Sequence, residues 1–289
     1  MKSRPRWRVS WAAAPAVVAV TALGGFSQVV EAQTWRTVTM SRQHDGESSL
    51  DVRIRYGVGR LDLRSAEPGL LYSMRLRYDE EVYEPVADYE GNRLRLGVDV
   101  IQRKIRVGER DHVGQLDVAL ARGVPTDLDL EFGAGRADLD LGGLSLTRLD
   151  LRTGASETRL DVSSPNPERM RDATIEVGAA EFSARKLGNL NAAEIVISAG
   201  VGQVTLDFTG EWRRDADVVV DMGLGSLELR FPEGIGVRLR KNTFLTAFDS
   251  EGLIKRGDSY YSPDWDEAEH RITLDVDAAF GSIEVAWVR

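Results

Sequence analysis

The residues that most often bind metals or act as nucleophiles are scarce in this sequence. It has no cysteine and only three histidines, His44, His112 and His270, which are far apart and lack the close spacing of a zinc site. No Gly-x-Ser-x-Gly turn occurs. The pair Gly57-Val-Gly59 lies between two apparent strands, whereas a phosphate-binding loop must lead into a helix. The sequence therefore predicts a protein that is not an enzyme and that binds no cofactor and no metal.

Carboxylates are the one abundant reactive group, and calcium is the metal that they would bind. A cluster of them precedes the middle of the chain: Asp79, Glu80, Glu81, Glu84, Asp88 and Glu90. The cluster lacks the alternating Asp-x-Asp-x-Asp-Gly pattern of a calcium loop. We therefore interpret it as a solvated acidic face.

Aromatic side chains gather with acids near the end of the chain. Tyr260, Tyr261, Trp265 and Asp264 lie together there. Asp258, Asp266 and Glu267 are close by in sequence, and aromatic rings with carboxylates are able to stack on a sugar ring and hydrogen-bond to it. The same rings would equally well close the end of an elongated fold. We favour this closing role and keep the four residues as a candidate interaction surface.

A pair of small residues separated by one other residue recurs along the chain, with alternating apolar residues on both sides. From Gly133 to Gly223 the successive spacings are 21, 24, 22 and 23 residues. Such a period predicts an all-β fold, a parallel β-helix or solenoid of ~22-residue rungs with small-x-small corners, and parallel crossovers favour the right-handed form. The predicted corner residues are Gly57, Gly59, Gly133, Gly135, Gly154, Gly178, Gly200, Gly202, Gly223, Gly225 and Gly281.

The residues after each corner alternate between apolar and polar, as a half-buried strand requires. The two predicted inward columns read Ala137, Thr158, Phe182, Val204, Leu227, Ile283, and Leu139, Leu160, Ala184, Leu206, Leu229, Val285. At the last corner Ala279 takes the place of the first glycine. We infer that close backbone approach, rather than a positive φ, selects glycine in that column.

The chain divides into four predicted parts. Residues 1–32 form a secretory signal peptide, with basic residues before an uncharged run and Val30-Glu-Ala32 as a cleavage site; retention as a membrane anchor is the alternative. Residues 33–122 form an amino-terminal β-subdomain that includes the first rung-like repeat. Residues 123–231 are the β-solenoid rungs, and residues 232–289 are an aromatic and acidic insertion that caps the stack, followed by the closing rung.

Several segments resemble the bacterial toast-rack family. They are Phe248-Asp-Ser-Glu-Gly-Leu253, Tyr260-Tyr-Ser-Pro-Asp-Trp265, Phe280-Gly-Ser-Ile-Glu-Val285 and, near the start, Tyr56-Gly-Val-Gly-Arg-Leu-Asp-Leu63. The carboxy-terminal domain of Lia-type cell-envelope stress proteins ends similarly, and β-helical adhesin-like proteins share the glycine-rich repeats. The resemblance implies a β-helical, non-enzymatic envelope domain and supplies no catalytic residues.

The formal net charge of −9 makes nucleic acid an improbable partner, because the chain would repel phosphate. The leading hypothesis is an exported interaction or scaffold domain at the bacterial cell envelope, adhesin-like or related to envelope stress. It would be periplasmic or extracellular, have no transmembrane anchor after signal cleavage, and bind an envelope protein or glycan. The alternative is a β-helix that binds or cleaves polysaccharide.

Overall fold

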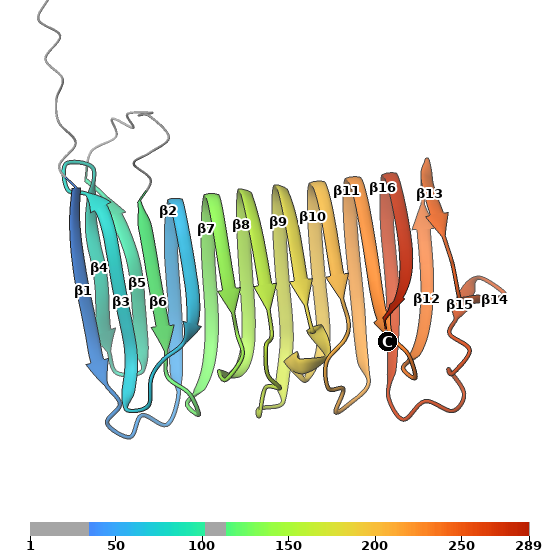
Figure 1. Cartoon of the computed structure of the whole chain (residues 1–289), viewed down its shortest axis with the longest axis horizontal. Coiled ribbons are helices and arrows are strands. Elements are labelled where there is room, and N and C mark those ends of the chain that lie inside the picture. The colour runs from blue at the N-terminus through green and yellow to red at the C-terminus, as the bar shows by residue number, and fades with distance from the viewer. Residues whose placement is uncertain (1–34, 102–113, 289) are drawn as a thin grey trace, which may run out of the picture. The chain divides into compact units, whose positions relative to one another are not determined.

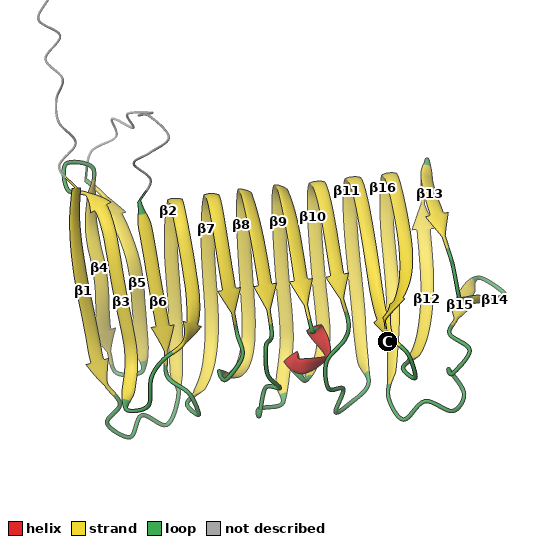
Figure 2. Cartoon of the chain, viewed as in Figure 1, coloured by secondary structure: helices red, strands yellow, loops and turns green. Residues whose placement is uncertain are grey.

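The computed structural model describes residues 35–101 and 114–288, which belong to one compact unit, Gln33–Arg289 (Figure 1). The described part is built from strands and one short 3-10 helix, η1 (Leu187–Leu190), which confirms the all-β prediction (Figure 2). The predicted signal peptide and His112 lie outside the described residues. The strands are β1 (Trp35–Gln43), β2 (Leu50–Ser65), β3 (Leu70–Asp79), β4 (Tyr83–Glu90), β5 (Arg93–Val100), β6 (Gln115–Leu120), β7 (Pro125–Asp140), β8 (Ser145–Asp161), β9 (Met170–Arg185), β10 (Ala192–Asp207), β11 (Ala216–Pro232), β12 (Gly236–Thr243), β13 (Thr246–Asp249), β14 (Ile254–Arg256), β15 (Ser259–Tyr261) and β16 (Arg271–Val288).

Seven long strands, β2, β7 to β11 and β16, pair side by side in parallel, and each contains a small-x-small corner. From β7 to β11 the paired residues are offset by 21, 24, 22 and 23 positions, as Leu130, Leu151, Ile175, Ile197 and Val220 show in turn. Every long strand therefore has a first half before its corner and a second half after it. Stacking in register places equivalent side chains of neighbouring strands about 4.8 Å apart.

The core runs through the stack between the first and second halves of the strands. Ile54, Ile175 and Ile197 from the first halves are 0% exposed, and so are Ala184 and Leu206 from the second halves. All twelve residues of the two predicted inward columns are buried. Burying a Leu or Ile side chain contributes roughly 1.5–3 kcal/mol, so the alternating pattern is the main source of stability.

Buried asparagines complete the connections between rungs. The side chain of Asn166 accepts a hydrogen bond from the Leu146 amide and donates to the Leu146 and Leu190 carbonyls, and Asn189 donates to Val162. Asn166 is 3% exposed, although Pro165 and Pro167 predict a loose surface loop around it. These amides supply partners for backbone groups that the turns leave unpaired.

Both ends of the stack have a rung that is out of sequence order. At one end β5 pairs with the first half of β2 and β6 with its second half, so that β2 lies inside them. At the other end β12 and β13 pair with the two halves of β16, whose other side pairs with β11. The chain's last strand is therefore not the outermost one. Because β12 places Val237 and Leu239 in the core, the segment predicted as a capping insertion contributes an outer rung of its own.

Antiparallel strands cover the outer rungs. β4 pairs with β5, and β3 pairs with β6 and with β1; at the other end β15 pairs with β12 and β14 with β15. In Figure 1 these strands lie at the two ends of the row. A bare parallel edge would invite pairing with another chain, and these strands occupy it.

Candidate functional site

The glycines of the first corner column allow close contact between neighbouring rungs. Gly133, Gly154, Gly178, Gly200 and Gly223 all have φ outside the left-handed region. A Cβ at any of them would press on the carbonyl oxygen of the glycine one rung earlier, at 3.0 Å for Gly178 and 3.1 Å for Gly200. Close approach is therefore what selects glycine in this column. Gly57, which starts the column, has nothing within 4 Å of such a Cβ.

The second corner column has a different requirement. Gly59, Gly135, Gly202, Gly225 and Gly281 have φ between +117° and +146°, a region that side chains disfavour. In β8 the equivalent position is Ser156, whose hydroxyl lies 2.9 Å from that of Thr158 in the core. The residue between the two columns points outward, and Val58, Val201, Leu224 and Phe280 are 45–56% exposed there.

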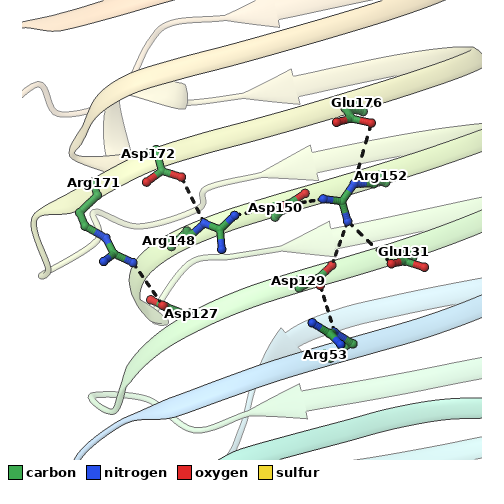
Figure 3. A network of polar contacts seen from close by, with 10 residues as sticks. All are labelled: Arg53, Asp127, Asp129, Glu131, Arg148, Asp150, Arg152, Arg171, Asp172 and Glu176. Atoms are coloured by element: carbon green, nitrogen blue, oxygen red, sulfur yellow. Dashed lines mark hydrogen bonds and ion pairs between the residues drawn. The ribbon is translucent and has the colours of Figure 1, made fainter.

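Charged side chains on the first halves of β2 and β7 to β9 form a network across the rungs, shown in Figure 3. Arg152 is its centre: its guanidinium lies 2.7 Å from Asp150, 3.4 Å from Asp129 and 3.9 Å from Glu176. Arg53 contacts Asp129 from the other side at 3.1 Å. The carboxylate of Asp150 is 9% exposed, so the two arginines that contact it, Arg148 and Arg152, compensate a largely desolvated charge.

Beyond this network the same face contains a groove of about 730 Å³ that runs from β8 to β12. Its floor is the first corner column, Gly178, Gly200, Gly223 and Ala279. Phe244, 65% exposed, lies at the β12 end. The groove thus combines a floor of small residues, an exposed aromatic ring and polar side chains.

The polar side of the groove is a ladder of equivalent outward residues, Glu176, Ser198, Asp221, Asp277 and Asn242, in register on five neighbouring strands. We call these residues the polar ladder. Within the described residues, the side chains of Ser198, Asp221, Asp277 and Asn242 have no hydrogen-bond or ion-pair partner. Asp221 and Asp277 are directly opposite each other, an arrangement of like charges that costs stability.

Next to the groove, Thr153 carries a buried hydroxyl at an inward position of β8. The residue is 6% exposed, lines the groove beside Arg152, and its hydroxyl oxygen has no hydrogen-bond partner within the described part of the chain. A buried hydroxyl normally has a hydrogen-bond partner.

A second hollow of about 540 Å³ adjoins the groove through Asn242 and Asp277, and Lys255 and Tyr260 line it.

Sequence reasoning did not select the polar ladder, because its members recur 22 or more residues apart and look like ordinary solvated positions. The signal that would have found them is the outward column immediately before the corner. In β7 to β9 this column reads Glu131, Arg152, Glu176, with alternating signs, whereas Asp221 and Asp277 follow each other without a cation.

The aromatic residues predicted as a candidate interaction surface pack against their own neighbourhood. Tyr260 and Tyr261 lie on β15, where Tyr260 meets Phe248 edge-on at 4.9 Å and Tyr261 meets Trp265 at 5.4 Å. Each of these tyrosines and Trp265 is half-buried, and a cationic side chain lies over each ring. Asp264 is exposed, and its backbone carbonyl accepts the amides of Glu267 and Ala268. This packing is compatible with the end-closing role that the sequence analysis favours for these rings.

The acidic cluster runs from the end of β3 through the turn into β4, and two of its members have separate arginine partners. Glu80 pairs with Arg36 at 2.5 Å, and Asp88 pairs with Arg95 at 2.7 Å. Within residues 35–101 and 114–288 no group of three or more His, Asp or Glu residues is arranged to hold a metal ion. His44 contacts Glu47 at 3.7 Å, and His270 lies 4.0 Å from Asp215.

Comparison with protein families identifies the class to which this fold belongs. The family described as the N-terminal domain of toast-rack, DUF2154, matches residues 29–185 and, a second time, residues 172–230. The matches span more than half of the sequence, so the chain belongs to the toast-rack family, and the resemblance noted from the sequence is confirmed. The closing segment, residues 248–285, lies beyond the matched residues.

Three solved structures are similar to the chain. A candidate cell adhesion protein from Clostridium sporogenes is 17% identical, with 88% of this chain and 100% of that chain covered and a TM-score of 0.49. A candidate adhesin from Bacteroides fragilis is 12% identical over 86% and 97%, with a TM-score of 0.41. A candidate lipid-binding protein from Parabacteroides distasonis is 9% identical over 88% and 97%, with a TM-score of 0.31. Curated proteins yield no match.

Among the described residues no helix is long and apolar enough to cross a membrane.

Proposed function

We propose that the protein is an exported, non-enzymatic interaction domain of the bacterial cell envelope, adhesin-like in the sense that it binds a partner and performs no chemistry on it. The observation that carries this proposal is the polar ladder: Ser198, Asp221, Asp277 and Asn242 line the groove in register and have no hydrogen-bond or ion-pair partner among the described residues. Membership of the toast-rack family agrees with it.

Export is the part of the proposal that depends on the amino-terminal sequence. Basic residues, an uncharged run from Trp11 to Val30 and the tripeptide Val30-Glu-Ala32 have the order of a secretory signal. Mass determination of the amino terminus of the protein from its native host tests it. A start at Gln33 supports export with cleavage, and an intact amino terminus opposes cleavage.

We further propose that the stack is a right-handed parallel β-helix whose rungs average about 22 residues. The register offsets of 21 to 24 residues between β7 and β11 support the rung length. The strong preference of parallel crossovers for the right hand supports the handedness. An experimentally phased crystal structure tests both.

Capture from envelopes tests the binding role. The tagged full chain is incubated with detergent-solubilised envelope material, and retained proteins and glycans are identified, with Asp221→Ala/Asp277→Ala as the matched variant. A partner retained by the parent chain and lost by the variant supports an interaction domain that uses the ladder. Retention of nothing specific contradicts the proposal.

A cleavage assay distinguishes a binding protein from a polysaccharide-cleaving enzyme. Asp221 and Asp277 are two carboxylates at neighbouring positions in a groove, the arrangement that a polysaccharide-cleaving enzyme would need. Incubation of the protein with envelope polysaccharide, followed by size analysis of the products, is expected to show no cleavage. Cleavage that is lost in Asp277→Asn would replace the proposed function with an enzymatic one.

A further inference from the structure

The groove on the first halves of β8 to β11, β16 and β12 has the chemistry of a glycan site. We propose that it binds an unbranched glycan chain without anionic groups, laid across the strands along the polar ladder. This inference rests on the proposed binding function and names its ligand class and its site. The spacing of the ladder, its charge and the apolar surfaces beside it all suit such a chain.

The ladder repeats with the spacing of the strands, which lie about 4.8 Å apart. Ser198, Asp221, Asp277 and Asn242 stand in consecutive register positions, so a ligand that crosses the strands meets one polar side chain at every rung. An extended sugar polymer offers hydroxyl groups at a similar repeat. A bound chain would therefore find a hydrogen-bonding group for each of several successive sugar units.

Among the charged residues that line the groove, Glu176, Asp221 and Asp277 outnumber Arg152, so the groove disfavours anionic polymers. Asp221 and Asp277 are exposed, and within the described residues no cation pairs with either of them. Carboxylates accept hydrogen bonds from sugar hydroxyls strongly, and they repel uronate, sulfate or phosphate groups. Asn242 and Ser198 each donate and accept, which suits hydroxyl groups in either orientation.

The apolar surfaces match the C–H faces of sugar rings. Gly178, Gly200, Gly223 and Ala279 leave a floor with almost no side chain, so a flat ring can approach the sheet. Phe244 closes the β12 end, 65% exposed, and Phe280 holds it edge-on with ring centroids 5.7 Å apart. An exposed aromatic ring that a neighbouring ring holds in place is suited to stacking against a sugar ring.

An extended peptide fits this groove less well. Peptides bind to sheets by adding a strand to an open edge. Here β9, β10, β11 and β16 each pair on both sides, and their backbone groups are already used. A peptide would therefore depend on side chains alone, and it is treated as an alternative outcome of the test.

Binding of defined oligosaccharides to the full chain tests the inference. The protein is kept in a detergent whose headgroup contains no sugar, and calorimetric titrations are made with cellohexaose, with the hexamer of N-acetylglucosamine and with hexagalacturonate. We expect at least one neutral hexamer to bind and hexagalacturonate not to bind. Asp221→Ala and Asp277→Ala are each expected to weaken binding about tenfold, the effect of losing one strong hydrogen bond.

Two further variants test whether binding depends on the groove. Asp217→Ala removes an equally exposed carboxylate from β11 outside the groove, and its affinity is expected to equal that of the parent chain. Ala279→Trp fills the floor and is expected to abolish binding; circular dichroism checks that it still folds.

Failure of the inference is distinguishable from failure of the proposed function. If neither neutral hexamer binds while the envelope capture still retains a protein or a basic peptide, the glycan assignment is overturned and the interaction role stands. Binding of hexagalacturonate, or equal losses in Asp217→Ala and Asp277→Ala, would also overturn it. If no hexamer binds and the capture retains nothing, both proposals fall.

Discussion

Gly133 lies directly against the carbonyl group of Gly57, one rung earlier, so that a Cβ on Gly133 would overlap that oxygen. Gly57 occupies the same corner column and has no atom within 4 Å of the position of its own Cβ. Neither residue has φ in the left-handed region. Glycine is thus required at position 133 and not at position 57. The difference arises because only Gly133 has a backbone carbonyl group of a preceding rung next to its Cα.

This pair predicts opposite effects of the same substitution. Gly133→Ala is expected to lower the free energy of unfolding by about 1–3 kcal/mol, because the added methyl group forces neighbouring rungs apart. Gly57→Ala is expected to be neutral or to raise it by about 0.4–1 kcal/mol, because alanine reduces the freedom of the unfolded chain. Urea denaturation of both variants measures the difference. Equal effects at the two positions would mean that the corner is not set by close approach.

The ion pairs of Arg152 and Arg185 are expected to differ in their contribution to stability. Arg152→Met removes a cation from Asp150, whose carboxylate is 9% exposed, and is expected to cost about 1–3 kcal/mol of stability. Arg185→Met removes an exposed partner of Asp161 and is expected to cost at most about 1 kcal/mol. The double variant Asp150→Asn/Arg152→Met should recover part of the loss, because no buried charge remains. Denaturation curves of the four proteins test this, and a loss at Arg185 as large as at Arg152 would contradict it.

The stack of rungs could be predicted from the sequence because its information is local. Each copy carries its own corner glycine and its own alternation, as in Val204 and Leu206 or Leu227 and Leu229, and both inward columns are buried as expected. The reason for the first glycine column was also accessible, since Ala279 replaces glycine there and a positive φ would disfavour alanine.

The order of the end rungs and the groove could not be predicted in this way. The alternating segments β12 and β16 are equally suitable neighbours for β11, and periodicity does not say which one pairs with it. The groove depends on that choice, because Asn242 and Phe244 reach Asp277 only when β12 lies outside β16. A ladder built from distant segments therefore becomes visible only after the strands are paired.

Tyr56 predicts a loss of stability in alkaline solution. Its side chain packs in the core near Phe132, and burial, with smaller effects of Tyr83 and Asp117, raises the pKa of the Tyr56 phenol well above its ordinary value. Above pH ~10 the unfolded chain releases this proton and the folded chain keeps it, so the free energy of unfolding falls as pH rises. The slope for one such group is at most about 1.4 kcal/mol per pH unit.

Urea denaturation at several pH values between 9 and 11 measures this slope. Tyr56→Phe is expected to make it shallower, because the variant has no phenol at this buried position. An unchanged slope in Tyr56→Phe would show that other groups cause the alkaline loss.

From the position of strand β16 we expect its backbone amides to be among the most protected against hydrogen exchange. β16 pairs with β11 along one side and with β12 and β13 along the other, and Ile272 and Leu274 are fully buried. Its amides should therefore exchange with solvent as slowly as those of β11, and more slowly than those of β14 and β15, which lie outside it. Hydrogen exchange followed by mass spectrometry measures all of these segments together.

Leu274→Ala is expected to lower the free energy of unfolding by about 2–5 kcal/mol. It should speed exchange in β11, β12 and β16 alike, since one side chain supports three strands. Exchange of β16 as fast as that of β15 would mean that β16 is an outer strand, and the groove would then lose Asn242 and Phe244.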